Sequence, residues 1–338
     1  MPPNTDVNRR RFLTLGGIAC LGAALAACGS GSDDEPSSGD GWTFTDDRGY
    51  TVGLGATPGR VVAFTGSAGA LADYGVREPL VGIFGDVSTG KGTPRALAGD
   101  LNVDDLTVVG DDWGQFDIEK YALLEPDLLV TDTYVPDRLW YIPDDSRQKI
   151  ESANPNVIAL AVADRGLPTI IGRYEELAAA LGADLTAEPV VVAKARFEAA
   201  AQAVRDAVAR RPGIRVLAAS AAPATFYVSD PSTSADLSYF AELGVELVVP
   251  DEVDSGGYFQ SLSWESADRY RADLILLDSR SSAGQPDALA SNAVWRSLPA
   301  VRAGQVTPWN PVFRFSHTGA APLLEDLAVA LDRANRLG

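Results

Sequence analysis

Short apolar runs alternate with helical patterns along most of the chain from residue 60 onward. In the first half, such runs predict strands at residues 60–64, 80–83, 107–109, 128–130 and 157–160, with helices at 68–74 and 118–124. The runs lack polar alternation, so we expect both faces of each strand to be buried, as in a parallel sheet flanked by helices. The pattern therefore predicts an α/β lobe over residues 42–186.

The longest helical pattern covers residues 187–211. Its apolar residues Phe197, Ala201, Val204 and Val208 fall on one stripe, and the Pro-Gly pair at 212–213 ends it. At 1.5 Å per residue this helix is about 35 Å long, which is enough to cross from one lobe to another. We expect it to be a connecting helix.

The α/β rhythm then restarts. Strands are predicted at residues 215–219, 246–249 and 273–277, with helices at 235–243 and 322–336. Almost 300 residues follow residue 42, which is more than one hydrophobic core usually accommodates. The fold class we predict is α/β, with two Rossmann-like lobes joined by a single long helix, the second lobe covering residues 212–338.

The first 28 residues resemble a bacterial export signal. Paired arginines precede Phe12 and a short apolar stretch, as in the twin-arginine signal, and the stretch ends in Leu-Ala-Ala-Cys, as in a lipobox. This resemblance implies that residues 1–27 are removed and that Cys28 receives a lipid. We expect residues 28–41 to be a flexible linker and the protein to be anchored at the outer face of the cytoplasmic membrane.

Charge and composition exclude several classes of protein. The formal net charge is −18, and the first 27 residues contribute three Arg and one Asp, so the remainder is more acidic still. Such a surface repels nucleic acid. A site for bare zinc or manganese needs several imidazole or thiolate ligands, whereas this chain has one His and two Cys. We expect no cofactor and no protein metal site.

Several segments along the chain form an ordered set. They are residues 42–50 (WTFTDDRGY), 58–62 (PGRVV), 116–119 (FDIE), 124–130 (LEPDLLV), 262–265 (LSWE), 272–275 (ADLI) and 295–306 (WRSLPAVRAGQV). In their order and spacing they resemble the substrate-binding proteins of iron-siderophore and cobalamin ABC importers. The resemblance implies a ligand cleft between two lobes bridged by one helix, with little opening and closing. It also implies no catalysis, because ATPase subunits would supply the energy for import.

Loops at the carboxyl ends of strands would line such a cleft. Rings can stack on a flat or apolar chelate, and guanidinium groups offer forked donors to its negative oxygens. Tyr141 and Phe315 lie in the same loops, but we expect them to serve packing alone. The ligand-binding candidates are Trp113, Tyr134, Arg138, Trp140, Tyr227, Tyr258, Arg280, Trp309, Phe313 and Arg314.

The resemblance also implies partners. Glu119 and Glu265 occupy matching places in the two lobes, where this family carries the glutamates that dock onto the permease. The hypothesis is thus a monomeric, lipid-anchored receptor that binds a ferric siderophore and delivers it to an ABC permease. The sequence leaves open whether the chelate is a hydroxamate, catecholate or carboxylate siderophore, haem or cobalamin.

A secreted serine hydrolase is the alternative from another class. Ser67 follows a strand in the run 65–69 (TGSAG), and Asp278 and His317 come later in the order typical of α/β-hydrolases. The run has Thr65 where the nucleophile elbow requires glycine, and Ser67 follows the first strand instead of a central one.

Overall fold

The computed structural model describes residues 41–87 and 97–337. The expected signal segment, Cys28 and all but the last residue of the expected linker lie outside these residues. No helix in the described part is long and apolar enough to cross a membrane.

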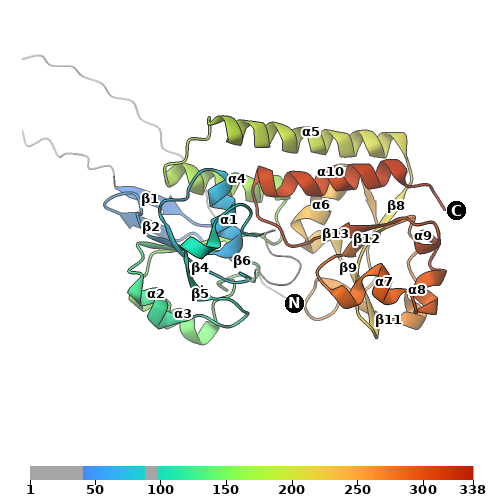
Figure 1. Ribbon diagram of the computed structural model, residues 1–338, viewed down its shortest axis with the longest axis horizontal. Coiled ribbons are helices and arrows are strands. Elements are labelled where there is room, and N and C mark those ends of the chain that lie inside the picture. The colour runs from blue at the N-terminus through green and yellow to red at the C-terminus, as the bar shows by residue number, and fades with distance from the viewer. Residues whose placement is uncertain (1–40, 88–96, 338) are drawn as a thin grey trace, which may run out of the picture. The chain divides into compact units, whose positions relative to one another are not determined.

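The N-terminal lobe is built on a fully parallel sheet in the order β5-β4-β3-β6-β7. All five predicted strands are present. Four of them are largely buried on both faces, whereas the edge strand β5 buries only Val109. Helices α1 and α4 cover one face, and α2 and α3 the other (Figure 1). The strands are β3 (Val61–Phe64), β4 (Leu80–Phe84), β5 (Thr107–Gly110), β6 (Leu128–Thr133) and β7 (Val157–Ala161), and the helices are α1 (Thr65–Asp73), α2 (Ile118–Leu123), α3 (Asp144–Ala153) and α4 (Leu167–Ala180).

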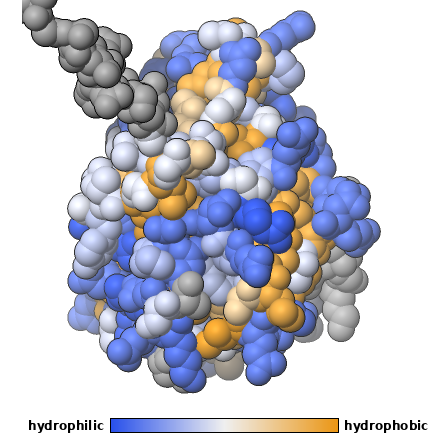
Figure 2. All heavy atoms as spheres, turned by 90° about the vertical axis from the view of Figure 1, so that its left-hand side faces the viewer, coloured by the Kyte–Doolittle hydropathy of each residue, from blue (hydrophilic) through white to orange (hydrophobic). Residues whose placement is uncertain are grey.

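A hairpin of β1 (Trp42–Thr45) and β2 (Thr51–Leu54) precedes this sheet. The Trp42 Nε1 donates a hydrogen bond of 2.6 Å to the Ala180 carbonyl at the end of α4. The face of the molecule at this end carries separate apolar patches among hydrophilic side chains (Figure 2). Scattered apolar surface of this kind is ordinary in globular proteins.

The expected connecting helix is α5 (Glu188–Arg210). Glu188 and Pro189 begin it, and it buries Phe197, Ala201 and Val204 along one stripe. Helix α10 (His317–Arg333) packs along α5 (Figure 1). The predicted start of this last helix at residue 322 was wrong, because the Ser316 side chain caps it by accepting a hydrogen bond from the Gly319 amide. Pro322 lies inside the first turns instead.

The C-terminal lobe has a mixed sheet with the path β11-β9-β8-β12-β13, and β10 pairs with β8. Strands β9 and β11 are antiparallel and were not predicted, because each is only five residues long and mixes apolar residues with Ser, Thr or Gln. The predicted strand 246–249 is shorter than expected, since only two of its residues pair. The strands are β8 (Arg215–Ala221), β9 (Thr225–Ser229), β10 (Glu246–Leu247), β11 (Phe259–Ser263), β12 (Leu274–Asp278) and β13 (Val306–Trp309).

Two layers of helices enclose this second sheet. Helices α6 (Ala235–Glu242), α5 and α10 cover one face, and α7 (Pro286–Leu289), α8 (Ala293–Ser297) and α9 (Pro299–Arg302) cover the other. The apolar cluster under α6 and α10 is continuous with the cluster under α1 and α4. A shared core therefore joins the two lobes.

Candidate functional site

The strand order places a crevice at the carboxyl ends of the N-terminal sheet. The chain leaves β3 for β4 on one side of the sheet and later returns to β6 on the other side. In open α/β sheets, ligands bind where the strand order reverses in this way. Phe64 ends β3 and Asp132 lies one residue before the end of β6, so both residues sit at this switch point.

A cavity of about 290 Å³ opens here, between residues of both lobes. The N-terminal lobe contributes the ends of β3 and β6 and the loops after β4 and β6, and the C-terminal lobe contributes loops after β12 and β13. The lining residues are Phe64, Asp86, Leu97, Asp132, Tyr134, Trp140, Tyr141, Arg280, Asn310, Pro311, Val312, Phe313 and Phe315.

Aromatic rings form the wall after β6. The ring centroids of Tyr134 and Trp140 are 4.1 Å apart, and those of Trp113 and Trp140 are 4.7 Å apart. Trp113 is 60% exposed and borders this wall without lining the cavity itself. The Trp140 amide donates a hydrogen bond of 2.9 Å to the Asp132 carbonyl, which fixes this loop on the end of β6. The result is a stable ring surface of the kind that stacks on a flat ligand.

Arg280 comes from the other lobe, two residues after the end of β12. Its Nη2 lies 2.6 Å from Asp278 Oδ2, and its Nε donates to both oxygens of the same carboxylate. Burial acts against ionisation of Asp278, but the hydrogen bonds from Arg280 hold the pKa of Asp278 below its usual value. The ion pair orients the guanidinium, whose side chain remains half exposed beside the cavity.

The other two predicted arginines are engaged elsewhere. Arg138 is exposed and lies 3.4 Å from Asp144. Arg314 is largely buried, and its Nε lies 2.5 Å from Asp73 Oδ2 on helix α1. Neither arginine lines the cavity. The structure therefore brings only one of the three predicted arginines to this site.

The three remaining aromatic candidates have different surroundings. Tyr227 lies on β9 with its ring 5.2 Å from that of Phe259. Tyr258 is partly exposed and close enough to Tyr134 to add to the effect of burial and of Asp132 in raising the pKa of Tyr134. Trp309 is buried, and its Nε1 donates a hydrogen bond of 2.7 Å to Asp236.

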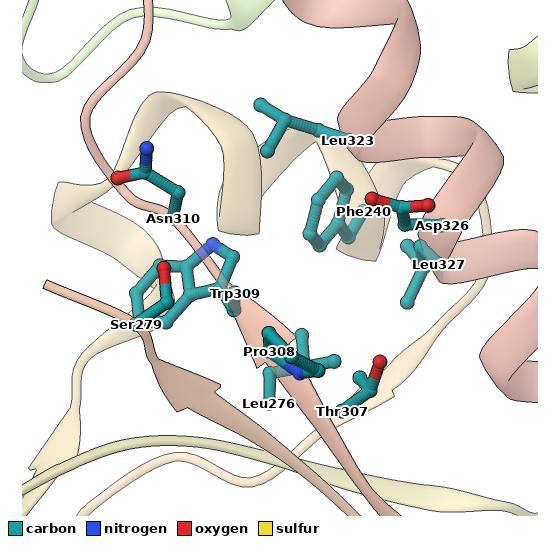
Figure 3. Close-up of a pocket in the computed structure, with 10 residues that line it drawn as sticks. All are labelled: Phe240, Leu276, Ser279, Thr307, Pro308, Trp309, Asn310, Leu323, Asp326 and Leu327. Carbon is teal, nitrogen blue, oxygen red and sulfur yellow. The ribbon is translucent and has the colours of Figure 1, made fainter. Parts of the chain in front are cut away.

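A second, smaller hollow of about 190 Å³ lies within the C-terminal lobe, between β13, α6 and α10. Figure 3 shows Trp309 on one side of it and Phe240 and Leu327 on the other. Trp309 thus faces this apolar hollow instead of the cavity between the lobes. Asn310 borders both spaces.

Several lining residues were missed by sequence reasoning. Tyr141 and Phe315, which we expected to serve packing alone, both line the cavity. Asp132 lies within an apolar strand, so its burial gave no sign of a site. The others carry no distinguishing signal in sequence, and they are Phe64, Asp86, Leu97, Asn310, Pro311 and Val312.

The serine hydrolase alternative is wrong. Ser67 is fully buried in α1, and its Oγ lies 2.8 Å from the Tyr174 hydroxyl. His317 Nδ1 faces Tyr74 and Glu175 instead, and Asp278 is held by Arg280 and Ser220 in the other lobe. The three residues do not form a nucleophile, base and orienting acid in contact with one another, as that chemistry requires.

The two glutamates with an expected docking role are both exposed. Glu119 lies in the first turn of α2, and Glu265 lies in the short 3₁₀ helix Trp264–Ser266. One is therefore presented on each lobe. Among the described residues, no group of three or more His, Cys, Asp and Glu side chains is arranged to hold a metal ion.

Comparison with known proteins finds relatives that are binding proteins or receptors. Residues 61–312 match the family model described as periplasmic binding protein. The crystal structure of DesE, a ferric-siderophore receptor protein from Streptomyces coelicolor, is 45% identical, with a TM-score of 0.81 over 88% of this chain and 100% of that chain. The petrobactin-binding protein YclQ from Bacillus subtilis is 16% identical, with a TM-score of 0.65 over 87% of this chain and 99% of that one. The latter shows likeness of fold alone. No curated protein sequence matches.

Proposed function

Because this chain belongs to the periplasmic binding protein family, we propose that it captures a ferric siderophore between its lobes and delivers it to an ABC permease. The observation that carries the proposal is the cavity between the lobes, with its ring wall on one side and Arg280 on the other. The likeness to a ferric-siderophore receptor over nearly the whole described chain supports it.

The site can hold such a chelate without altering its bonds. The rings of Tyr134, Trp140 and Phe313 offer apolar contact to the organic shell, and Arg280 offers donors to metal-bound oxygens. The iron would arrive already wrapped in its ligand, so the protein needs no metal ligands of its own. The partner subunits would hydrolyse ATP, and this chain would only bind and release.

Anchoring and docking complete the proposal. A lipid on Cys28 would hold the receptor at the outer face of the cytoplasmic membrane, with residues 28–41 as a linker. Glu119 and Glu265, exposed on separate lobes, would contact the permease. The receptor would act as a monomer.

Tryptophan fluorescence tests the ligand assignment. Trp140 lines the cavity, so a coloured ferric chelate should quench it with saturable dose dependence. The W140F variant should lose most of that quenching, whereas W295F should keep it, because Trp295 is buried in the core of the C-terminal lobe. Flat titrations with ferric hydroxamate, catecholate and carboxylate siderophores, haem and cobalamin would refute the proposed function.

A further inference from the structure

Asp132 is a carboxylate built into the wall of the cavity. Only 1% of the residue is exposed, yet it is one of the residues that line this space. Its Oδ1 accepts a hydrogen bond from the Tyr174 hydroxyl and lies 3.5 Å from the Ser67 Oγ. These two hydroxyls come from α4 and α1 and lie 2.8 Å from each other. Three elements of the N-terminal lobe therefore fix the orientation of the carboxylate.

The second oxygen of this carboxylate has no hydrogen-bond donor among residues 41–87 and 97–337. Asp132 Oδ2 is not completely enclosed either, because within those residues the Tyr121 hydroxyl is the only fully buried side-chain oxygen or nitrogen without a partner. The neighbouring wall is mostly apolar, with Phe64, Leu97 and Phe315 among its members. Burial raises the pKa of Asp132 to about 7, against the lowering effect of Tyr174 and Ser67. A nearly buried acceptor without a partner is unfavourable, and Oδ2 keeps access to the cavity, where a group of a bound solute can reach it.

A solute that carries a hydrogen-bond donor could supply the missing partner of Oδ2. A ligand N–H or O–H group placed against Oδ2 would satisfy the oxygen, and hydrogen bonds to charged acceptors are the stronger class. When Asp132 is ionised, the same oxygen would repel a purely acceptor surface, such as the bare oxygens of an anionic chelate. Asp132 therefore discriminates by the presence of a donor, whereas the ring wall accepts any apolar face.

We propose that Asp132 is a specificity-determining residue of the solute site, whose Oδ2 accepts a hydrogen bond from an N–H or O–H group of the bound chelate. This inference rests on the proposed function and names the substrate class within it. The chelate presents a donor to the N-terminal lobe and oxygen acceptors to Arg280 on the C-terminal lobe. Tyr174 and Ser67 are positioning residues, since they hold the carboxylate through its other oxygen.

Two neutral ferric chelates make a matched pair of probes. Iron(III) tris(acetohydroxamate) carries N–H groups, and iron(III) tris(N-methylacetohydroxamate) has methyl groups in their place. Dissociation constants would be measured by fluorescence quenching and calorimetry with excess hydroxamate, for the wild-type chain and for D132L. Leucine has the branched shape of aspartate without an acceptor, and Ser67 and Tyr174 can still bond to each other. The control D164N changes an exposed aspartate of the same lobe outside the cavity.

At about pH 8.5, above the pKa of Asp132, the wild-type chain should bind the N–H chelate at least about tenfold more tightly than the N-methyl chelate, as expected for a hydrogen bond to a charged acceptor. That preference should vanish in D132L and persist in D164N. If D132L fails to fold, D132N replaces it, with an expected loss of preference of at least about threefold, because a neutral amide is a weaker acceptor. A preference that survives the substitution overturns the inference alone. A wild-type chain that binds neither chelate counts against the proposed function and removes the inference with it.

Discussion

Removing the contact between Asp73 and the segment before α10 tests how the lobes are held together. Asp73 ends α1 in the N-terminal lobe, and Arg314 and Ser316 follow β13 of the C-terminal lobe. Asp73 Oδ2 accepts hydrogen bonds from Arg314 Nε and from the Ser316 hydroxyl. The two charged side chains are only 6% and 14% exposed, so water screens this pair weakly.

The D73A substitution should therefore be costly. Removing one partner of a buried ion pair leaves the other charge with less compensation, which typically lowers the free energy of unfolding by about 3 to 5 kcal/mol. The matched control is E325A, which removes the pair between Arg196 on α5 and Glu325 on α10. Those side chains are 49% and 39% exposed, so this loss should be about 0 to 1 kcal/mol.

Guanidinium unfolding followed by circular dichroism and by tryptophan fluorescence would give both free energies. Hydrogen exchange adds a local measurement, since amides in residues 313–317 should exchange faster in D73A while those of α5 stay protected. If D73A costs no more than E325A, the buried contact does not hold the lobes together and this reasoning fails.

Three further outcomes are expected. Burial lowers the pKa of His317 to about 4, so the unfolded chain binds the extra proton first and the contribution of His317 to stability should fall between about pH 6.5 and 4. Burial raises the pKa of Asp132 and of Asp236, which adds stability as the pH falls through the same range, so thermal unfolding should show that the wild-type chain loses stability relative to H317Q. The E119A/E265A double variant should bind the chelate normally but cut uptake by complemented cells at least about tenfold, whereas E78A, which changes another exposed glutamate, should transport normally. The C28A variant should leave the membrane fraction for the soluble fraction, and retention on the membrane would contradict lipid anchoring there.

Most of the N-terminal sheet could be predicted because four of its five strands are largely buried on both faces. An uninterrupted apolar run of four or five residues, such as that of β3 or β7, is typical of such a strand. β11 escaped prediction because it alternates buried and exposed residues over a five-residue stretch of Phe, Gln and Ser. This antiparallel strand lies at the end of the sheet path. Five residues are too few to distinguish the two-residue alternation of a strand from the irregular sequence of a loop.

Site residues could be predicted where the end of a strand fixes the position of the side chain. They could not be predicted where an ion-pair partner fixes it. Tyr134 and Arg280 follow apolar strands, so topology alone brings them to the cavity. Arg314 follows β13 in the same way, but its carboxylate partner lies 241 positions earlier in the chain. Nothing in a single sequence selects Asp73 from the many acidic residues available. Side-chain pairing across lobes is therefore the part of the site that sequence reasoning misses.

The way in which the lobes are joined bears on how the receptor can be selective. Helix α10 packs along α5, and the core under α6 is continuous with that under α1. Tyr174 of one lobe also stacks on Phe315 from the segment before α10, with centroids 6.3 Å apart. We expect a body held in this way to move little on binding, so that little binding energy is lost in ordering it. Selectivity would then come from fixed groups on the cavity wall, because the lobes would not close around one particular shape. Asp132 and Arg280, each oriented by its own hydrogen bonds, are placed to supply it.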